Sequence, residues 1–265
     1  MSRIGAVFAR LRAQRRLALI PYTTVGYPDV ETTVALAPAL VAAGADLIEL
    51  GMPFSDPLAD GATIQHASQA ALAGGVTART CLRVAERLRA LISAPLILMG
   101  YYNPILRYGP AAFCRDAGAA GVDGLIVPDL PPEEAGELRE AALANDLDLI
   151  FLLASTSTED RIGLVCQAAS GFVYCAALAG VTGARQSLAA DLAEFTARVR
   201  QHTTLPLAVG FGISRPEHVA AVRRLADGAI VGSALIERLD SAPAEERVAA
   251  AATYLATLRA AADDD

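Results

Sequence analysis

The sequence predicts an α/β protein: a single barrel of eight parallel strands surrounded by helices, a (β/α)8 or TIM barrel, with an extra helix at the N-terminus. The chain has 265 residues, close to the roughly 250 that such a barrel needs. From Leu17 onward, short apolar runs alternate with alanine-rich helical patterns, and Gly or Pro separates many of them. No linker or low-complexity segment interrupts this alternation, so we expect residues 1–265 to form one domain.

Eight apolar runs of strand length recur along the chain. They lie near Leu17–Thr23, Asp46–Leu50, Pro95–Met99, Asp123–Val127, Leu147–Leu152, Phe172–Cys175, Leu205–Val209 and Gly228–Val231. Helical patterns follow them at Val30–Ala43, Ala62 onward, Ala78–Ile92, Ala111–Ala119, Glu133–Asn145, Glu159–Ala168, Asp191–Gln201, Pro216–Leu225 and Glu245–Ala262. The arginine-rich stretch Ser2–Arg16 faintly resembles a transit peptide. Its apolar residues fall at helical spacing, which favours a helix that covers one end of the domain.

The composition restricts where the protein works and what it binds. Hydrophobic residues make up 54% of the chain, but no apolar run approaches the roughly 18 residues of a membrane span. The net charge of −7 and the lack of a basic, aromatic patch argue against nucleic-acid binding. The cysteines have no metal or redox spacing, which is typical of a reduced, cytoplasmic protein. They are Cys81, Cys114, Cys166 and Cys175.

Two residue types restrict the chemistry. The chain contains no lysine, which excludes a lysine Schiff base. His66, His202 and His218 stand far apart in the sequence, so we expect no histidine metal site, although carboxylates alone could still hold a weak one.

The loop after the second expected strand places two carboxylates near each other. Glu49 interrupts an apolar strand, where an ionised carboxylate is costly unless it is paired or its pKa is shifted. Pro53 and Pro57 hold the following loop extended, and Asp60 ends it before a helix begins. Asp60 could simply cap that helix, and Glu49 could satisfy a buried backbone donor. Their joint presence on a proline-braced loop favours a catalytic pair.

Three glycine-bearing loops follow the last three expected strands, and in a barrel these loops meet at one end. They are Ala179–Gly183, Gly210–Ser214 and Gly232–Leu235. Glycines let backbone N–H groups approach an oxyanion, and Gly232-Ser233 opens a helix whose N-terminus carries positive partial charge. Together the loops predict a phosphorylated ligand. The aromatic residues near strand ends could wall a flat apolar ligand, although each alone suits the core: Tyr22, Tyr101, Tyr102, Tyr174 and Phe211.

These motifs resemble the tryptophan synthase alpha subunit family. The long stretch Glu49–Gly61 looks like the signature of that family. Thr24 with Gly26 and Pro28, Tyr101–Pro104 and the three glycine loops follow in the family's order over nearly the whole chain. The resemblance implies retro-aldol cleavage of indole-3-glycerol phosphate to indole and glyceraldehyde 3-phosphate. It also implies a beta-subunit partner in an alpha2beta2 heterotetramer; the partner would hold pyridoxal phosphate, and this chain would hold no cofactor.

The chemistry of the residues agrees with this resemblance. Without lysine for an imine or a good metal site, the substrate itself must accept the electrons of the broken carbon–carbon bond, and indole can do so once its C3 is protonated. One group must then move protons at the reacting carbons, and another must balance positive charge on the ring nitrogen. Glu49 suits the first task and Asp60 the second.

By resemblance, further residues are expected to bind substrate or partner. Tyr174 would lie beside Glu49. The phosphate would contact Gly183, Gly212, Gly232 and Ser233, and the rest of the substrate Tyr22, Tyr101, Thr182 and Phe211. The rigid, partly apolar rim of the barrel suggests a docking face for the beta subunit at Pro53, Asp56, Asn103, Pro104, Asp129 and Pro131. Two positions depart from the family: Ala177-Leu178 replaces a frequent Ser-Arg, and Tyr22 replaces a common phenylalanine.

Three alternatives compete with this interpretation. A free-standing lyase without a partner would carry the same catalytic residues. A non-catalytic barrel that binds the phosphate ligand and regulates a partner is disfavoured because both Glu49 and Asp60 are present. A sugar-phosphate isomerase is disfavoured by the absence of lysine and by the proline-braced loop.

Overall fold

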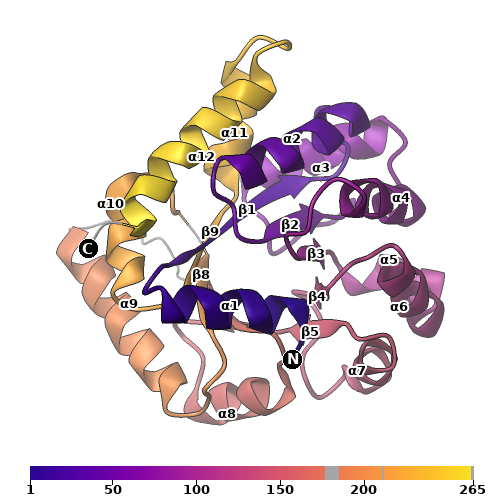
Figure 1. Cartoon of the computed structure of the whole chain (residues 1–265). Coiled ribbons are helices and arrows are strands. Elements are labelled where there is room, and N and C mark those ends of the chain that lie inside the picture. Colours follow the sequence, from indigo (N-terminus) through magenta and orange to yellow (C-terminus); the bar gives the residue numbers. More distant parts are fainter. Residues whose placement is uncertain (177–184, 211, 264–265) are drawn as a thin grey trace.

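The strands form a barrel with helices on its outside (Figure 1). The computed structural model describes residues 1–176, 185–210 and 212–263. In this part of the chain, nine strands pair in parallel in the order β5-β4-β3-β2-β1-β9-β8-β7-β6. They are β1 (Ala18–Thr24), β2 (Ile48–Gly51), β3 (Leu96–Met99), β4 (Gly124–Ile126), β5 (Asp148–Ile150), β6 (Leu152–Ala154), β7 (Val173–Ala176), β8 (Leu207–Gly210) and β9 (Gly228–Val231).

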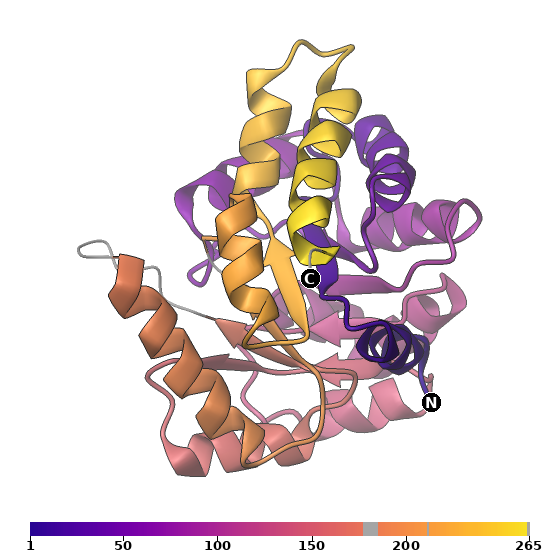
Figure 2. The same cartoon turned by 60° about the vertical axis from the view of Figure 1, so that its left-hand side comes forward.

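Apart from α1, the helices surround the outer face of this sheet, and several pack in pairs, such as α11 with α12 (Figure 2). Their bounds are α1 (Arg3–Ala13), α2 (Val30–Ala42), α3 (Ala62–Ala73), α4 (Ala78–Arg89), α5 (Tyr102–Tyr108), α6 (Pro110–Ala119), α7 (Gly136–Leu143), α8 (Glu159–Ala168), α9 (Arg185–Arg200), α10 (Pro216–Arg223), α11 (Ser233–Ser241) and α12 (Arg247–Asp263). None of the described helices has the length and apolar character needed to cross a membrane.

The fifth barrel strand closes the ring. β5 and β6 are separated only by Phe151, yet β5 pairs with β4 and β6 pairs with β7. The Phe151 carbonyl accepts a hydrogen bond from the Tyr174 N–H of β7 at 3.0 Å, so the residue that links the two pieces also bonds to the neighbouring strand. The nine pieces therefore make eight barrel strands, and the expected eight-stranded barrel is confirmed.

Helix α1 closes the amino-terminal end of the barrel. In β1, Ala18 and Ile20 face the interior while Leu19 packs outward beneath the helices, as the two-residue period of a strand requires. Phe8 of α1 joins the interior cluster, and its ring lies 5.6 Å from that of Phe172. The expected covering helix is confirmed.

Aspartates brace the same amino-terminal end. Asp46, Asp123 and Asp227 each precede a strand, and each carboxylate accepts an N–H from the neighbouring strand at 2.8–3.0 Å. Each also binds an arginine. The donors are Leu19 and Arg259 for Asp46, Leu96 and Arg89 for Asp123, and Leu207 and Arg200 for Asp227. These contacts stabilise the end of the barrel opposite the candidate site.

Helix α5 was not expected from the sequence. The Asp129 carboxylate, from the loop after β4, accepts the Tyr102 N–H at the start of this helix at 2.8 Å. It satisfies a backbone donor that has no partner within the helix. Because this cap comes from a distant loop, no local pattern at Tyr101–Pro104 indicated the helix.

Candidate active site

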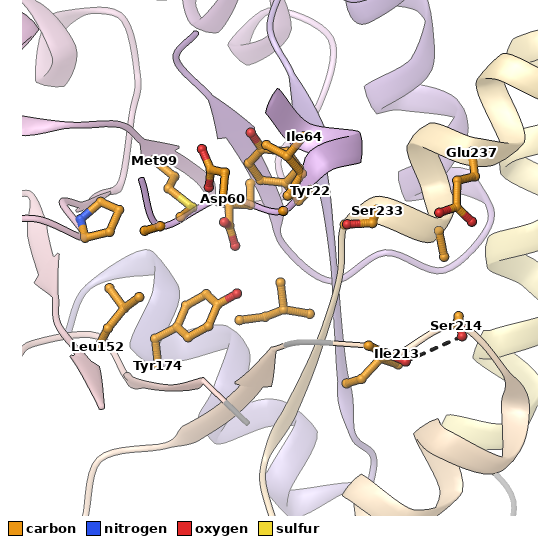
Figure 3. Close-up of a pocket in the computed structure, with 18 residues that line it drawn as sticks. Tyr22, Asp60, Ile64, Met99, Leu152, Tyr174, Ile213, Ser214, Ser233 and Glu237 are labelled. Carbon is orange, nitrogen blue, oxygen red and sulfur yellow. Dashed lines mark hydrogen bonds between the residues drawn. The ribbon is translucent and has the colours of Figure 1, made fainter. Parts of the chain in front are cut away.

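A cavity of about 280 Å³ opens at the carboxyl ends of the strands. The predicted site residues that line it are Tyr22, Glu49, Asp60, Tyr174, Gly212, Gly232 and Ser233 (Figure 3). They come from β1, β2, the loop after β2, β7 and the loops after β8 and β9. The structure thus brings the predicted carboxylates together with two of the three glycine loops.

Glu49 is a buried carboxyl group that lacks full hydrogen bonding. Its side chain belongs to β2, only 1% of the residue is exposed, and its Oε2 atom has no hydrogen-bond partner among the described residues. Burial, and then the nearby Asp60, raise the pKa of this carboxyl from 4.5 to about 8. Glu49 is therefore a neutral acid at pH 7, able to donate a proton.

Asp60 remains mostly ionised beside it. Burial raises the pKa of Asp60 to about 6, and a hydrogen bond with Tyr101 opposes this rise. The N-cap residue of α3 is Gly61, which forms no side-chain cap, so a simple capping role for Asp60 is wrong. Two neighbouring carboxyls whose pKa values are pushed apart are typical of an acid paired with a charge-stabilising group.

Tyr101 fixes the loop that carries Asp60. Its hydroxyl accepts the Ala59 N–H at 2.8 Å, and its ring stacks on Phe54 with 5.1 Å between centroids. Tyr101 does not belong to the described cavity lining. In this structure it positions the Asp60 loop.

Tyr22 and Tyr174 occupy the cavity wall because two glycines leave room for them. A Cβ atom on Gly51 would overlap the Tyr22 hydroxyl, and one on Gly210 would overlap the Tyr174 hydroxyl. Burial raises the pKa of both phenols, so they remain neutral. The sequence did not predict this supporting role of the two glycines, because the tyrosines that they accommodate lie on neighbouring strands.

The glycine loops place backbone N–H groups that lack helical partners at the cavity. Gly232 and Ser233 lie at the N-terminus of α11, where backbone N–H groups have no helical partners. Gly212 adopts a φ of 71°, a left-handed conformation that favours glycine. Tyr254 holds the loop after β8 by donating to the Ser214 carbonyl at 3.1 Å. The predicted residues Thr182, Gly183 and Phe211 lie outside the described part of the chain, as does the Ala177-Leu178 departure.

Apolar residues complete the cavity and were not predicted from the sequence. They are Ile64, Met99, Pro128, Leu152, Ile213 and Ile230. In the sequence, an apolar side chain at a strand end that lines a cavity cannot be distinguished from one in the core, because the difference depends on the closed barrel. Glu237 also lines the cavity, and no motif indicated it.

The predicted docking residues occupy one rim. Asp56, Asn103 and Asp129 are exposed, and Pro104 and Pro131 are half-buried. Pro53 is buried, so it supports the loop and offers no surface in the isolated chain. Leu58 on the same loop is 94% exposed, which was not predicted and is unusual for a leucine outside an interface.

Fold and site together define a (β/α)8-barrel enzyme that combines a neutral acid, an ionised carboxylate and the free N-terminus of a helix around an apolar cavity. A family model described as tryptophan synthase alpha chain matches residues 8–263. The chain belongs to this family and has its lyase function.

Individual relatives agree with the family model over the full length. The tryptophan synthase alpha chain of Chloroflexus aurantiacus is 58% identical over 262 residues, covering 98% of each chain. That of Geobacter sulfurreducens is 48% identical over 98% of this chain and 99% of its own. A structure of Mycobacterium tuberculosis tryptophan synthase has a TM-score of 0.91 at 42% identity and covers 100% of this chain and 99% of its own. A Legionella pneumophila alpha subunit has a TM-score of 0.92 at 39% identity, with 99% coverage of both.

Proposed function

We propose that Glu49 and Asp60 perform the retro-aldol cleavage of indole-3-glycerol phosphate to indole and glyceraldehyde 3-phosphate. The observation that carries this proposal is the pair of carboxyls with pKa values of about 8 and about 6. Both lie in one apolar cavity, which also contains a helix N-terminus suited to phosphate.

The protons and electrons balance with these two residues alone. The Glu49 carboxyl gives its proton to C3 of the indole ring, and the Asp60 carboxylate balances the positive charge that develops at the ring nitrogen. The Glu49 carboxylate then removes the proton of the side-chain hydroxyl next to the ring. The carbon–carbon bond breaks, its electrons return to the ring, and a carbonyl forms. Glu49 ends protonated, ready for another cycle.

We further propose that the glycine loops hold the substrate phosphate through Gly212, Gly232 and Ser233, with Thr182 and Gly183 contributing from the loop after β7. Tyr22, Tyr174 and Phe211 would flank the indole ring, with Tyr101 positioning Asp60. Support comes from the placement of the described members of this set around one cavity.

A beta subunit is the proposed partner, in an alpha2beta2 assembly. The similar Mycobacterium structures are titled as tryptophan synthase, and one as its aminoacrylate-bound form. Pyridoxal phosphate would belong to the beta subunit. We propose docking through Asp56, Asn103, Pro104, Asp129 and Pro131, a rim on which the exposed Leu58 supplies apolar surface.

We also propose that residues 1–265 act as one catalytic domain in the cytoplasm. The four cysteines are free and buried, as is usual in a reducing compartment. Burial raises the pKa of Cys81 and Cys175 to about 12, which makes their thiols unreactive.

One experiment tests the reaction, and an extension tests the partner. The pure chain is incubated with indole-3-glycerol phosphate, and indole is measured by chromatography; absence of indole with and without a beta subunit contradicts the proposal. Titration with a beta subunit from a relative should raise the rate, and Asp56→Ala should weaken this stimulation. Indole formation with neither a complex nor a rate change would instead identify a free-standing lyase.

A further inference from the structure

The cavity that receives a phosphorylated substrate is bordered by acidic side chains. Three carboxyl groups line it, on Glu49, Asp60 and Glu237, and no arginine or histidine is among its described lining residues. The reaction uses Glu49 and Asp60, but Glu237 has no part in it. A carboxylate at the phosphate end of such a site works against anion binding, so its presence there points to a separate role.

Glu237 is placed directly above the anion site. It lies four residues after Ser233 in α11, so the two side chains share one helix face with about 5–6 Å between their Cβ atoms. Figure 3 shows both side chains on this helix, at the side of the cavity where Ser214 lies. Glu237 is exposed at the rim, so its carboxylate is solvated.

Glu237 forms no direct ion pair within the described part of the chain. Its neighbour Arg238 stacks its guanidinium over the Tyr254 ring, 5.1 Å from the centroid, and makes no salt bridge with Glu237. Two opposing effects would act on a phosphate here. The positive partial charge at the N-terminus of α11 attracts it, and the negative charge of Glu237, one turn later in the helix, repels it. The attraction acts at hydrogen-bond distance, whereas the repulsion acts over a longer separation and through solvent.

We propose that Glu237 determines the charge selectivity of the cavity. Backbone N–H groups hold the phosphate, and repulsion by Glu237 limits how tightly a phosphate monoester binds. This limit allows the phosphorylated product to leave. Glu237 also discriminates against ligands that carry further negative charge at this end. The inference rests on the proposed function in one respect: the phosphate must bind at Gly232 and Ser233.

The expected size of the effect follows from Coulomb's law. A dianion about 9 Å from a solvated carboxylate is repelled enough to weaken binding roughly three- to tenfold at low ionic strength. An uncharged ligand should feel none of this repulsion. The effect should almost vanish at about 1 M salt, where the screening length is only about 3 Å.

The test compares Glu237→Gln with the wild type and with a matched control, Glu140→Gln on α7. Glu140 is also exposed, so both substitutions remove one charge without disturbing the core. Calorimetry would measure binding of glycerol 3-phosphate, pyrophosphate and indole at about 0.01 M and about 1 M salt. Glu237→Gln should tighten glycerol 3-phosphate three- to tenfold at low salt and pyrophosphate more, with indole unchanged.

Each other outcome identifies what failed. The role of Glu237 is overturned if Glu237→Gln binds glycerol 3-phosphate no more tightly than the wild type does. It is also overturned if Glu140→Gln tightens this binding equally. Both outcomes leave the phosphate site intact. Equal tightening of indole also overturns this role, because indole carries no charge. If the wild-type chain binds indole but no glycerol 3-phosphate at either salt concentration, the proposed phosphate site itself is wrong.

Discussion

Replacing Glu49 by glutamine should abolish activity and at the same time stabilise the protein at neutral and alkaline pH. The neutral amide can neither donate nor accept the transferred proton, so indole formation should fall by about 10²–10⁴-fold or more. The gain in stability has a separate cause. The wild-type barrel must either keep a proton on Glu49 or bury its charge, and the amide removes this cost.

The magnitude follows from the pKa of the buried carboxyl, which rises from 4.5 to about 8 on folding. Because the folded chain binds this proton more tightly than the unfolded chain, Glu49 makes stability fall as pH rises from about 4.5, and the fall is complete above about 8. Each pH unit in this range costs about 1.4 kcal/mol, so the free energy of unfolding should decrease by about 3–4 kcal/mol between about pH 5 and about pH 8 from this group alone.

Urea unfolding of wild type and Glu49→Gln across this pH range measures the effect. The two proteins should differ little near pH 5, and the variant should become progressively more stable toward pH 8. Glu140→Gln, which changes an exposed carboxylate, controls for the loss of one charge. Parallel pH dependence of wild type and Glu49→Gln would refute the raised pKa and with it the assignment of Glu49 as a neutral acid.

Three further predictions concern the same cavity. The pH profile of kcat/KM should be bell-shaped, rising as Asp60 ionises near pH 6 and falling as Glu49 loses its proton near pH 8; a profile flat from about pH 5 to 9 contradicts the pairing. Gly232→Asp should weaken glycerol 3-phosphate binding at least about tenfold more than indole binding. A Cβ atom fits at Gly232, with no atom nearer than 3.7 Å, so the neutral variant Gly232→Asn serves as the control. Equal loss of glycerol 3-phosphate affinity in the two variants would mean that the effect is steric and not electrostatic. Tyr101→Phe removes the hydroxyl that bonds to the Ala59 N–H and to Asp60. The pKa of Asp60 should rise, which moves the acidic limb of the pH profile to higher pH. An unmoved limb would contradict this role of Tyr101.

Local patterns in the sequence contain most of the fold. Alternating apolar runs and helical patterns predicted eight strands, and the observed strands agree with them within a few residues. Helix α5 was missed because its cap, Asp129, comes from a loop 27 residues away. The division of the fifth strand into β5 and β6 was missed because it depends on which neighbours each half pairs with.

The sequence by itself determined which chemical groups are available: a glutamate within an apolar strand, an aspartate on a proline-braced loop, glycine turns, and no lysine. Only the tertiary structure decided how these groups behave. A pKa depends on burial and on charges from other strands, so the neutral state of Glu49 and the ionised state of Asp60 exist only inside the barrel. The same is true of Glu237, an ordinary helical residue in the sequence, which faces the cavity because α11 begins at the end of β9.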